Sequence, residues 1–199
     1  MPDPLPDAVP APVPAPVTNT PTDTPTGPDL VPDLVPGLNR LRHGRAAGAI
    51  ADRVDLAPGL ALIADPALRA TGRWRSPAGR LLELEIETGG RGDWMALHLA
   101  LATPDLAPAA FFGFACTGLA PQMQLIRACL RSGRADGGFV DCFFDRHILT
   151  APEPAAHVDA LHLPTQPEVP EDAPWRELLL FLPPEPVRWH LHDLRVFAA

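Results

Sequence analysis

The sequence predicts an all-β protein, an antiparallel β-sandwich of the jelly-roll type preceded by an extended proline-rich arm. Three observations predict this. Apolar and polar residues alternate with a period of two in several segments after residue 70, as in half-buried strands. These segments are short and separated by turn residues, with no long amphipathic helix between them. The chain also closes on an apolar, strand-like run, and terminal strands of such sheets pair with strands formed earlier.

Residues 1–37 are the predicted arm, and residues 38–199 are the predicted β-sandwich domain. Twelve of the first 36 residues are prolines. Proline fixes φ and lacks an N–H donor, so we expect extended, polyproline-II-like chain there. The same segment carries five aspartates and no basic residue, out of a net charge of −8 for the chain.

The arm contains the motif Asp-Leu-Val-Pro twice in succession, at 29–32 and 33–36. Its apolar side chains are the predicted docking element for a larger, oligomeric assembly. They are Leu30, Val31, Leu34 and Val35. The alternative is a disordered tail with no docking role.

A short helix or an irregular entry segment is predicted at the start of the domain, between residues 38 and 54. Leu38 and Leu41 could share one face of a helix, while Gly44 and Gly48 weaken it.

The first predicted strand is residues 60–63, bounded by Pro-Gly and Asp-Pro. Residues 82–87 alternate leucine or isoleucine with glutamate, which predicts a strand whose glutamates face solvent. A glycine-rich turn at 89–93 leads to a second alternating segment at 94–101. Together these segments predict a β-hairpin.

The second half of the chain contains further short apolar segments bracketed by glycine and proline. Residues 132–138, rich in glycine, predict a hairpin turn between two of them, and residues 175–197 predict two terminal strands joined by a proline-rich turn. The remaining predicted strands are residues 110–117, 123–131, 139–144, 146–150 and 157–163.

Composition excludes several classes of partner. All sixteen basic residues are arginine, against 24 acidic residues, and this balance argues against nucleic acid and against an anionic membrane surface. No apolar run is long enough to span a bilayer. No basic segment followed by an apolar stretch opens the chain, so we expect no secretory signal and synthesis in the cytoplasm.

The three cysteines are predicted to be buried free thiols. Cys116, Cys129 and Cys142 each lie in an apolar, strand-like run, and three thiols cannot all pair. Their spacing matches no zinc template.

No catalytic motif is present, so we expect no catalytic residue and no cofactor. The only serines are Ser76 and Ser132, neither in a nucleophile-elbow motif, and no phosphate- or dinucleotide-binding glycine motif occurs. The alternative is a carbohydrate-active enzyme that uses a pair of carboxylates, drawn from Asp141, Asp145 and the glutamates of residues 83–87. Spacing selects none of them.

His190 and His192 would place two imidazoles on one face of a strand, the arrangement in which cupin-like barrels present metal ligands. The glutamate that usually follows such a pair is absent. We therefore predict no metal site, and a metal-dependent enzyme stays an alternative.

The four tryptophans are the predicted binding platforms. Each lies at a strand end or beside a turn, next to arginine or aspartate. An indole stacks on the apolar face of a sugar ring, while arginine and carboxylate groups hydrogen-bond the hydroxyls. The predicted carbohydrate site is Trp74, Trp94, Trp175 and Trp189, with Arg73, Arg75 and Arg188 as polar partners. The alternative for each tryptophan is that its indole is buried in the core or caps the rim of the core.

Residues 70–199 resemble the jelly-roll carbohydrate-binding modules that accompany bacterial glycosidases. The resemblance lies in Trp175 opening a strand, the apolar run 178–182, and the apolar ending at 192–197. It implies a non-catalytic module that recognises polysaccharide. The chain departs from those modules, because we expect no signal peptide and the sequence shows no obvious calcium ligand set.

A proline-rich arm on a compact β-sandwich is also similar in architecture to the head spikes of alphaproteobacterial gene transfer agents. That resemblance implies a spike or fibre subunit of a phage-like particle that is released by lysis and binds cell-surface polysaccharide. A purely structural assembly subunit, without a ligand, is the remaining alternative.

Overall fold

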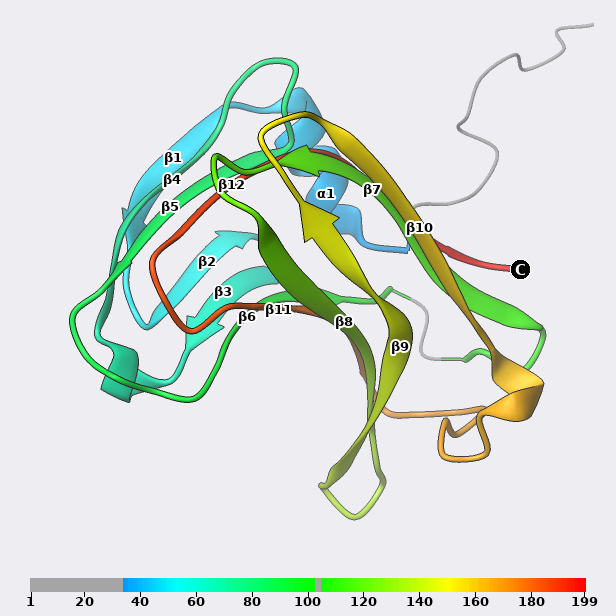
Figure 1. The fold of residues 1–199 in the computed structure, drawn as a ribbon. Coiled ribbons are helices and arrows are strands. Elements are labelled where there is room, and N and C mark those ends of the chain that lie inside the picture. Colours follow the sequence, from blue (N-terminus) through cyan, green and yellow to red (C-terminus); the bar gives the residue numbers. More distant parts are fainter. Residues whose placement is uncertain (1–33, 103–104) are drawn as a thin grey trace, which may run out of the picture. The chain divides into compact units, whose positions relative to one another are not determined.

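In the computed structural model, the described residues are 34–102 and 105–199, and they form two antiparallel β-sheets packed face to face (Figure 1). Sheet A has the strand order β1-β4-β5-β12-β7-β10, and sheet B has the order β2-β3-β6-β11-β8-β9. The helical elements are α1 (Pro36–His43) and the 3₁₀ helices η2 (Pro66–Leu68) and η3 (Leu163–Thr165). The strands are β1 (Ala46–Ile50), β2 (Arg53–Ala57), β3 (Leu60–Ala64), β4 (Ala70–Ser76), β5 (Leu82–Thr88), β6 (Met95–Ala100), β7 (Phe111–Leu119), β8 (Gln124–Gly133), β9 (Phe139–Thr150), β10 (Ala155–His162), β11 (Arg176–Leu182) and β12 (Val187–Ala198). The predicted all-β sandwich is confirmed.

From β5 onward the chain passes back and forth between the two sheets, as in a jelly roll, except at the β8–β9 hairpin, which stays in sheet B. The last strand, β12, lies between β5 and β7 in sheet A, so the chain does end on an internal strand as predicted. However, β11 lies in sheet B, between β6 and β8. The proline-rich segment 183–186 therefore carries the chain from one sheet to the other and does not close a hairpin.

The prediction that residues 82–87 and 94–101 form a hairpin is also wrong, because the two strands lie in different sheets. Strand β5 lies in sheet A and β6 lies in sheet B. The Asp65 carboxylate fixes the crossing, because it accepts the N–H groups of Ala67 and Asp93 at 2.9 Å each. Alternation identifies a strand with one buried face, but strands of either sheet satisfy it.

The hairpin turn predicted at residues 132–138 is confirmed between β8 and β9. The Arg134 N–H donates to the Gly138 carbonyl at 2.8 Å, and Gly137 has φ of 90°, which favours glycine. Strand β9 is continuous, where two strands were predicted, and it is bulged. In Figure 1 the β8–β9 hairpin extends well beyond the neighbouring strands of sheet B.

The entry segment forms α1, with proline at its first position and Gly44 just after its end. Val35, Leu38 and Leu41 are buried in the core between the sheets. This corrects the docking role predicted for Val35, because its side chain packs inside its own domain; Leu34 packs against the same core. Leu30 and Val31 lie outside the described residues.

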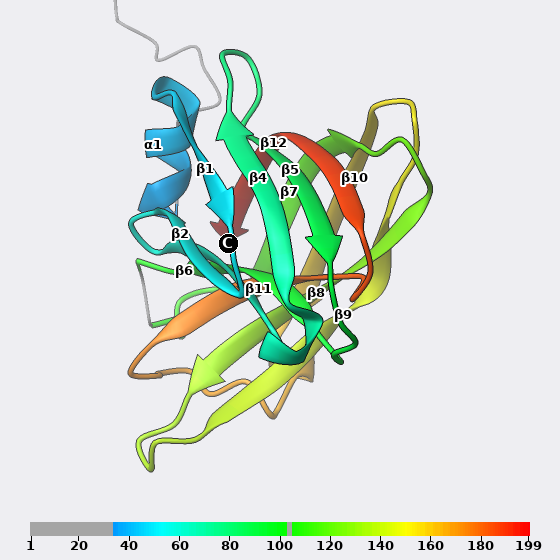
Figure 2. The same ribbon diagram turned by 90° about the vertical axis from the view of Figure 1, so that its left-hand side faces the viewer.

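Strands β1, β2 and β4 were not predicted. The sequence of β1, Ala-Ala-Gly-Ala-Ile, has no alternation of large apolar with polar residues, so periodicity carries no signal there. Figure 2 shows α1 beside β1, at the edge of the two sheets.

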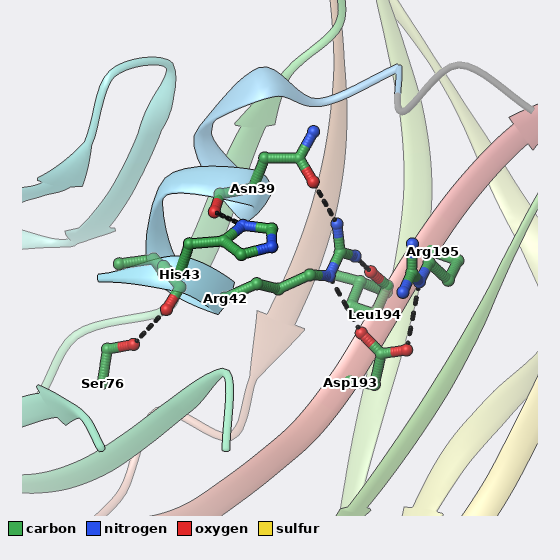
Figure 3. A network of polar contacts seen from close by, with 8 residues as sticks. Asn39, Arg42, His43, Ser76, Asp193, Leu194 and Arg195 are labelled. Carbon is green, nitrogen blue, oxygen red and sulfur yellow. Dashed lines mark hydrogen bonds and ion pairs between the residues drawn. The ribbon is translucent and has the colours of Figure 1, made fainter. Parts of the chain in front are cut away.

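A polar network holds α1 against the two sheet A strands β4 and β12 (Figure 3). Arg42 donates to the Asp193 carboxylate at 3.2 Å and to the main-chain carbonyl of the following residue, while Arg195 donates to the other oxygen of Asp193 at 3.1 Å. Ser76 donates to the carbonyl of Leu41 at 2.9 Å. Burial raises the pKa of Asp193, but the hydrogen bonds from the two arginines outweigh this and hold it below its ordinary value.

The core between the sheets is built from the inward residues of both. Phe114 of β7 meets Phe144 of β9 edge to face, with ring centroids 5.0 Å apart. The three cysteines are buried and free, as predicted. Within the described part of the chain, no helix is long and apolar enough to cross a membrane.

Candidate carbohydrate site on the outer face of sheet B

The outer face of sheet B, which points away from the core, carries most of the exposed apolar side chains. Nine large apolar side chains are exposed among the described residues, and strand alternation places six of them on this face. They are Trp94, Leu125, Phe139, Phe143, Leu149 and Trp175. An exposed apolar concentration of this kind marks a binding surface.

The outer face of sheet A is charged instead. Arg73 pairs with Glu85 at 2.6 Å, and Arg75 and Arg80 both bind Glu83. The Glu83 side chain is only 4% exposed, so the prediction that all the glutamates of this strand face solvent is wrong. Burial raises the pKa of Glu83, but the two arginine hydrogen bonds outweigh it and hold the pKa below its ordinary value.

The centre of the outer face of sheet B is a close-packed aromatic and aliphatic row. Leu179 and Cys129 are fully buried although they point away from the core, because larger neighbours cover them. Beside them the rings of Phe143 and Phe181 lie with centroids 5.9 Å apart. The Arg127 guanidinium lies over the Phe143 ring, 4.2 Å from its centroid.

Two polar pairs stand on the same face. Arg131 donates two hydrogen bonds to Asp141, at 2.6 and 2.7 Å, and its guanidinium lies 4.0 Å from the centroid of the Phe139 ring. The bidentate hydrogen bonds with Asp141 raise the pKa of Arg131. His98 and Glu177 form the second pair, with Nδ1 and Oε2 3.0 Å apart.

A groove of about 740 Å³ lies beside these pairs, between α1 and strands β2, β3, β6 and β11. Small residues form its hollow, because Ala61 and Ala100 occupy outward positions where larger side chains would fill it. Polar groups from several elements reach its walls. They are Arg40, Arg53, Asp55, His98 and Glu177.

Trp94 and Trp175 lie at opposite ends of the outer face of sheet B. Trp94 continues the β3–β6 pairing, since its carbonyl accepts the Asp65 N–H at 2.9 Å. Trp175 continues the β8–β11 pairing opposite Gly133, whose N–H donates to its carbonyl at 2.9 Å. Since β6 and β11 are antiparallel, Trp94 stands opposite residue 183, roughly 25 Å along the sheet from Trp175 at ~3.3 Å per residue.

Gly133 explains how the Trp175 indole lies across the sheet. A Cβ at this position would come within 2.5 Å of the indole nitrogen. The missing side chain therefore lets the indole cover β8, in the row that continues to Phe139 on β9. Trp175 is 41% exposed and Trp94 is 39% exposed.

The other two predicted platforms are core residues. Trp74 is 6% exposed and Trp189 is 1% exposed, because alternation turns both toward the opposite sheet. Each indole packs against a glycine of a neighbouring strand, Gly48 and Gly118 respectively. Neither ring offers a face to a ligand, and the prediction is corrected for both.

The predicted polar partners are also separated from the exposed tryptophans. Arg73 and Arg75 are paired with glutamates on the outer face of sheet A, and Arg188 stands opposite Glu85 on that same face. The structure therefore places Trp94 and Trp175 on one face, at its opposite ends, and leaves the three predicted arginines on the other sheet.

Sequence reasoning missed the residues that surround these two tryptophans. Phe143, Arg127, Arg131 and Phe181 received no role, and Asp141 was weighed only as a catalytic carboxylate. A signal was present in residues 139–147, where aromatic and charged side chains follow each other closely, but the side on which each falls depends on the bulge in β9.

Among the described residues, no three or more histidine, cysteine, aspartate or glutamate side chains come together in a way that could hold a metal ion. His190 Nδ1 lies 3.3 Å from Arg80. Burial, together with the charges of Arg80 and His190, lowers the pKa of His192. Burial raises the pKa of each cysteine thiol to about 12.

Comparison with known proteins gives structural likeness only. No protein-family model matches the chain, and no curated sequence matches it. The N-terminal cellulose-binding domain of β-1,4-glucanase C from Cellulomonas fimi is 13% identical with a TM-score of 0.45, over 64% of this chain and 84% of that domain. The CBM22-1 xylan-binding domain of Xyn10C from Paenibacillus barcinonensis is 10% identical with a TM-score of 0.44, over 83% and 90%.

A tailspike protein of bacteriophage CBA120, through its enzymatically active domain, is 10% identical with a TM-score of 0.48. The match covers 84% of this chain but only 21% of the tailspike chain. The fold assignment rests on the strand order and register of the chain itself, and the ligands named for these proteins are properties of those proteins.

Proposed function

We propose that this protein is a non-catalytic module that binds polysaccharide on the outer face of sheet B. The observation that carries the proposal is the placement of Trp94 and Trp175 at the two ends of one face. The Phe143–Phe181 pair lies along the strands between them, and a groove of about 740 Å³ lies to one side, over β2, β3 and β6. Exposed indoles stack on the apolar faces of sugar rings, and hydrogen-bonding groups between them orient the hydroxyls.

The carboxylates of this face support a binding role over a hydrolytic one. Asp141 is engaged by both of its oxygens with Arg131, and Glu177 is engaged with His98. A glycosidase of the ordinary kind needs one carboxyl group that donates a proton and one free to act as base or nucleophile. Carboxylates whose oxygens are already hydrogen-bonded in this way serve better as fixed acceptors for sugar hydroxyls.

The test is binding of the whole chain to a panel of soluble polysaccharides by affinity gel electrophoresis. We expect retardation by at least one polysaccharide, strongly reduced in the double variant Trp94→Ala/Trp175→Ala. The control is Phe111→Ala, which removes a 43% exposed aromatic residue from the outer face of sheet A. If the control and the double variant lose binding equally, or if no polysaccharide retards the protein, the proposed site is rejected.

We also propose that the proline-rich N-terminal segment joins the module to a larger oligomeric assembly, such as a spike or fibre on a phage-like particle released from the cell. Its acidic, proline-rich composition and its repeated Asp-Leu-Val-Pro motif support this. Because Val35 and Leu38 belong to the core, the truncated protein should begin at residue 34. We expect it to stay folded and to separate from the native assembly on gel filtration, while retention in the assembly would reject the tether.

A further inference from the structure

We infer that the polysaccharide bound on the outer face of sheet B is anionic, with uronic-acid carboxylates recognised by Arg127. This inference rests on the proposed function and specifies its ligand. It follows from the charges of the described residues that line this face.

Three carboxylates on the face already have a partner within the protein. Asp141 receives both hydrogen bonds of Arg131. Glu177 is hydrogen-bonded to His98, and Asp55 lies 3.9 Å from Arg53 in a looser, exposed pair. These three acidic groups are therefore partnered from within the protein, whereas Asp145, exposed two residues after Phe143 on β9, has no ion pair among the described residues.

Two arginines on the same face have no such compensation. Arg127 and Arg40 are exposed, and no carboxylate of the described residues lies within ion-pair distance of either. Arg40 and Arg53 stand on the wall of the groove, and Arg127 stands over the aromatic row next to it. Arg40, Arg53, Arg127 and Arg131 balance the four carboxylates Asp55, Asp141, Asp145 and Glu177, so this face is neutral although the chain as a whole carries −8.

The position of Arg127 suits it to a ligand carboxylate. Its guanidinium is held over the Phe143 ring, which restrains the side chain before the ligand arrives. A guanidinium presents two parallel N–H donors that match the two oxygens of a carboxylate. A sugar ring stacked beside Phe143 or Phe181 would bring its carboxylate to this fork.

The net charge of the chain makes a free arginine necessary for an anionic ligand. A polymer that carries carboxylates meets long-range repulsion from a protein of net charge −8, so its binding needs a local cation that can pair with it. Arg127 supplies this cation beside the aromatic row, whereas Arg73, Arg75 and Arg80 on the other sheet are engaged with glutamates.

The experiment compares polygalacturonate with the same polymer after chemical reduction of its carboxyl groups, using isothermal titration of the whole chain. We expect polygalacturonate to bind more tightly, and its affinity to fall when salt is raised from about 0.05 M to about 0.5 M. Arg127→Gln should weaken binding of polygalacturonate about tenfold, as for loss of one charge-assisted hydrogen bond. It should leave binding of the reduced polymer nearly unchanged.

Arg73→Gln is the matched control, since it removes one exposed positive charge from the outer face of sheet A. Equal affinity for the two polymers, or equal weakening by Arg127→Gln and Arg73→Gln, would overturn the anionic preference while leaving polysaccharide binding intact. Failure of both polymers and of the wider polysaccharide panel would overturn the proposed function and this inference with it.

Discussion

Replacing Trp175 by alanine gives the most direct test of the binding face, and the structure sets the size of the effect. The residue is 41% exposed. Since a tryptophan offers ~200 Å² of surface, about 80 Å² is open to a ligand, and complete coverage at ~25 cal/mol per Å² is worth about 2 kcal/mol. A sugar that covers half of that area contributes about 1 kcal/mol. We therefore expect Trp175→Ala to weaken binding between about five- and thirty-fold.

Affinity gel electrophoresis with a graded series of polysaccharide concentrations measures this change. Trp175→Phe should lose less than Trp175→Ala, because a smaller aromatic ring remains over Gly133. Phe111→Ala should change nothing, since that residue has nearly the same exposure, 43%, on the other sheet. Thermal melts of each variant separate lost binding from lost folding.

Trp94 lies at the far end of the face, and its replacement by alanine should also weaken binding. Roughly 25 Å of strand separates it from Trp175, so the two substitutions should act independently on a polymer that reaches both. The free-energy losses of the single variants should then add in the double variant. Wild-type affinity in well-folded Trp175→Ala would refute the placement of the ligand on this face.

Three further predictions concern the fold. Because arginine hydrogen bonds hold the pKa of Glu83 below 4.5, its contribution to stability is present above about pH 4.5 and is lost as pH falls through the lower folded-state pKa. Glu83→Gln should lower the free energy of unfolding by about 2 kcal/mol at neutral pH. In urea denaturation at a series of pH values, this variant should also lose less stability at acid pH than the wild type. Trp189→Ala should cost about 3–5 kcal/mol in the same assay, since the residue is 1% exposed, and a loss under 1 kcal/mol would contradict its core position. Thiol pKa values raised to about 12 predict no alkylation of the native protein at neutral pH and three alkylated thiols in denaturant. Rapid labelling of the native protein would contradict the burial of Cys116, Cys129 and Cys142.

The layer structure of this protein could be predicted from its sequence, but the assignment of strands to sheets could not. Alternation in residues 82–87 and 94–101 reports only that each strand has one buried face. The crossing between the sheets is set by the loop hydrogen bonds of Asp65 and by pairings with β11 and β12, which lie some hundred residues away in the chain. Non-local pairing of this kind leaves no local pattern.

The tryptophans show the same limit at the level of the site. Trp74 and Trp94 have similar neighbours in sequence, each beside a charged residue at the edge of an alternating segment. One falls on the inward side of β4 and is buried, while the other falls on the outward side of β6 and is exposed. A difference of one residue in strand phase decides between a core residue and a binding platform.

The outer face of sheet B is built before any ligand arrives. Leu179, Cys129 and Ala96 are fully buried although they lie on an outer face, because the side chains around them close over the sheet. Those side chains are themselves held, with Arg131 fixed by Asp141 and Arg127 resting on Phe143. A ligand that meets such a surface has few side chains to order, so little of the contact energy is lost in immobilising them. We therefore expect the binding free energy lost on removing one indole to approach the value calculated from its contact area. For the same reason, substitutions in the row between the two tryptophans should weaken binding without unfolding the sandwich.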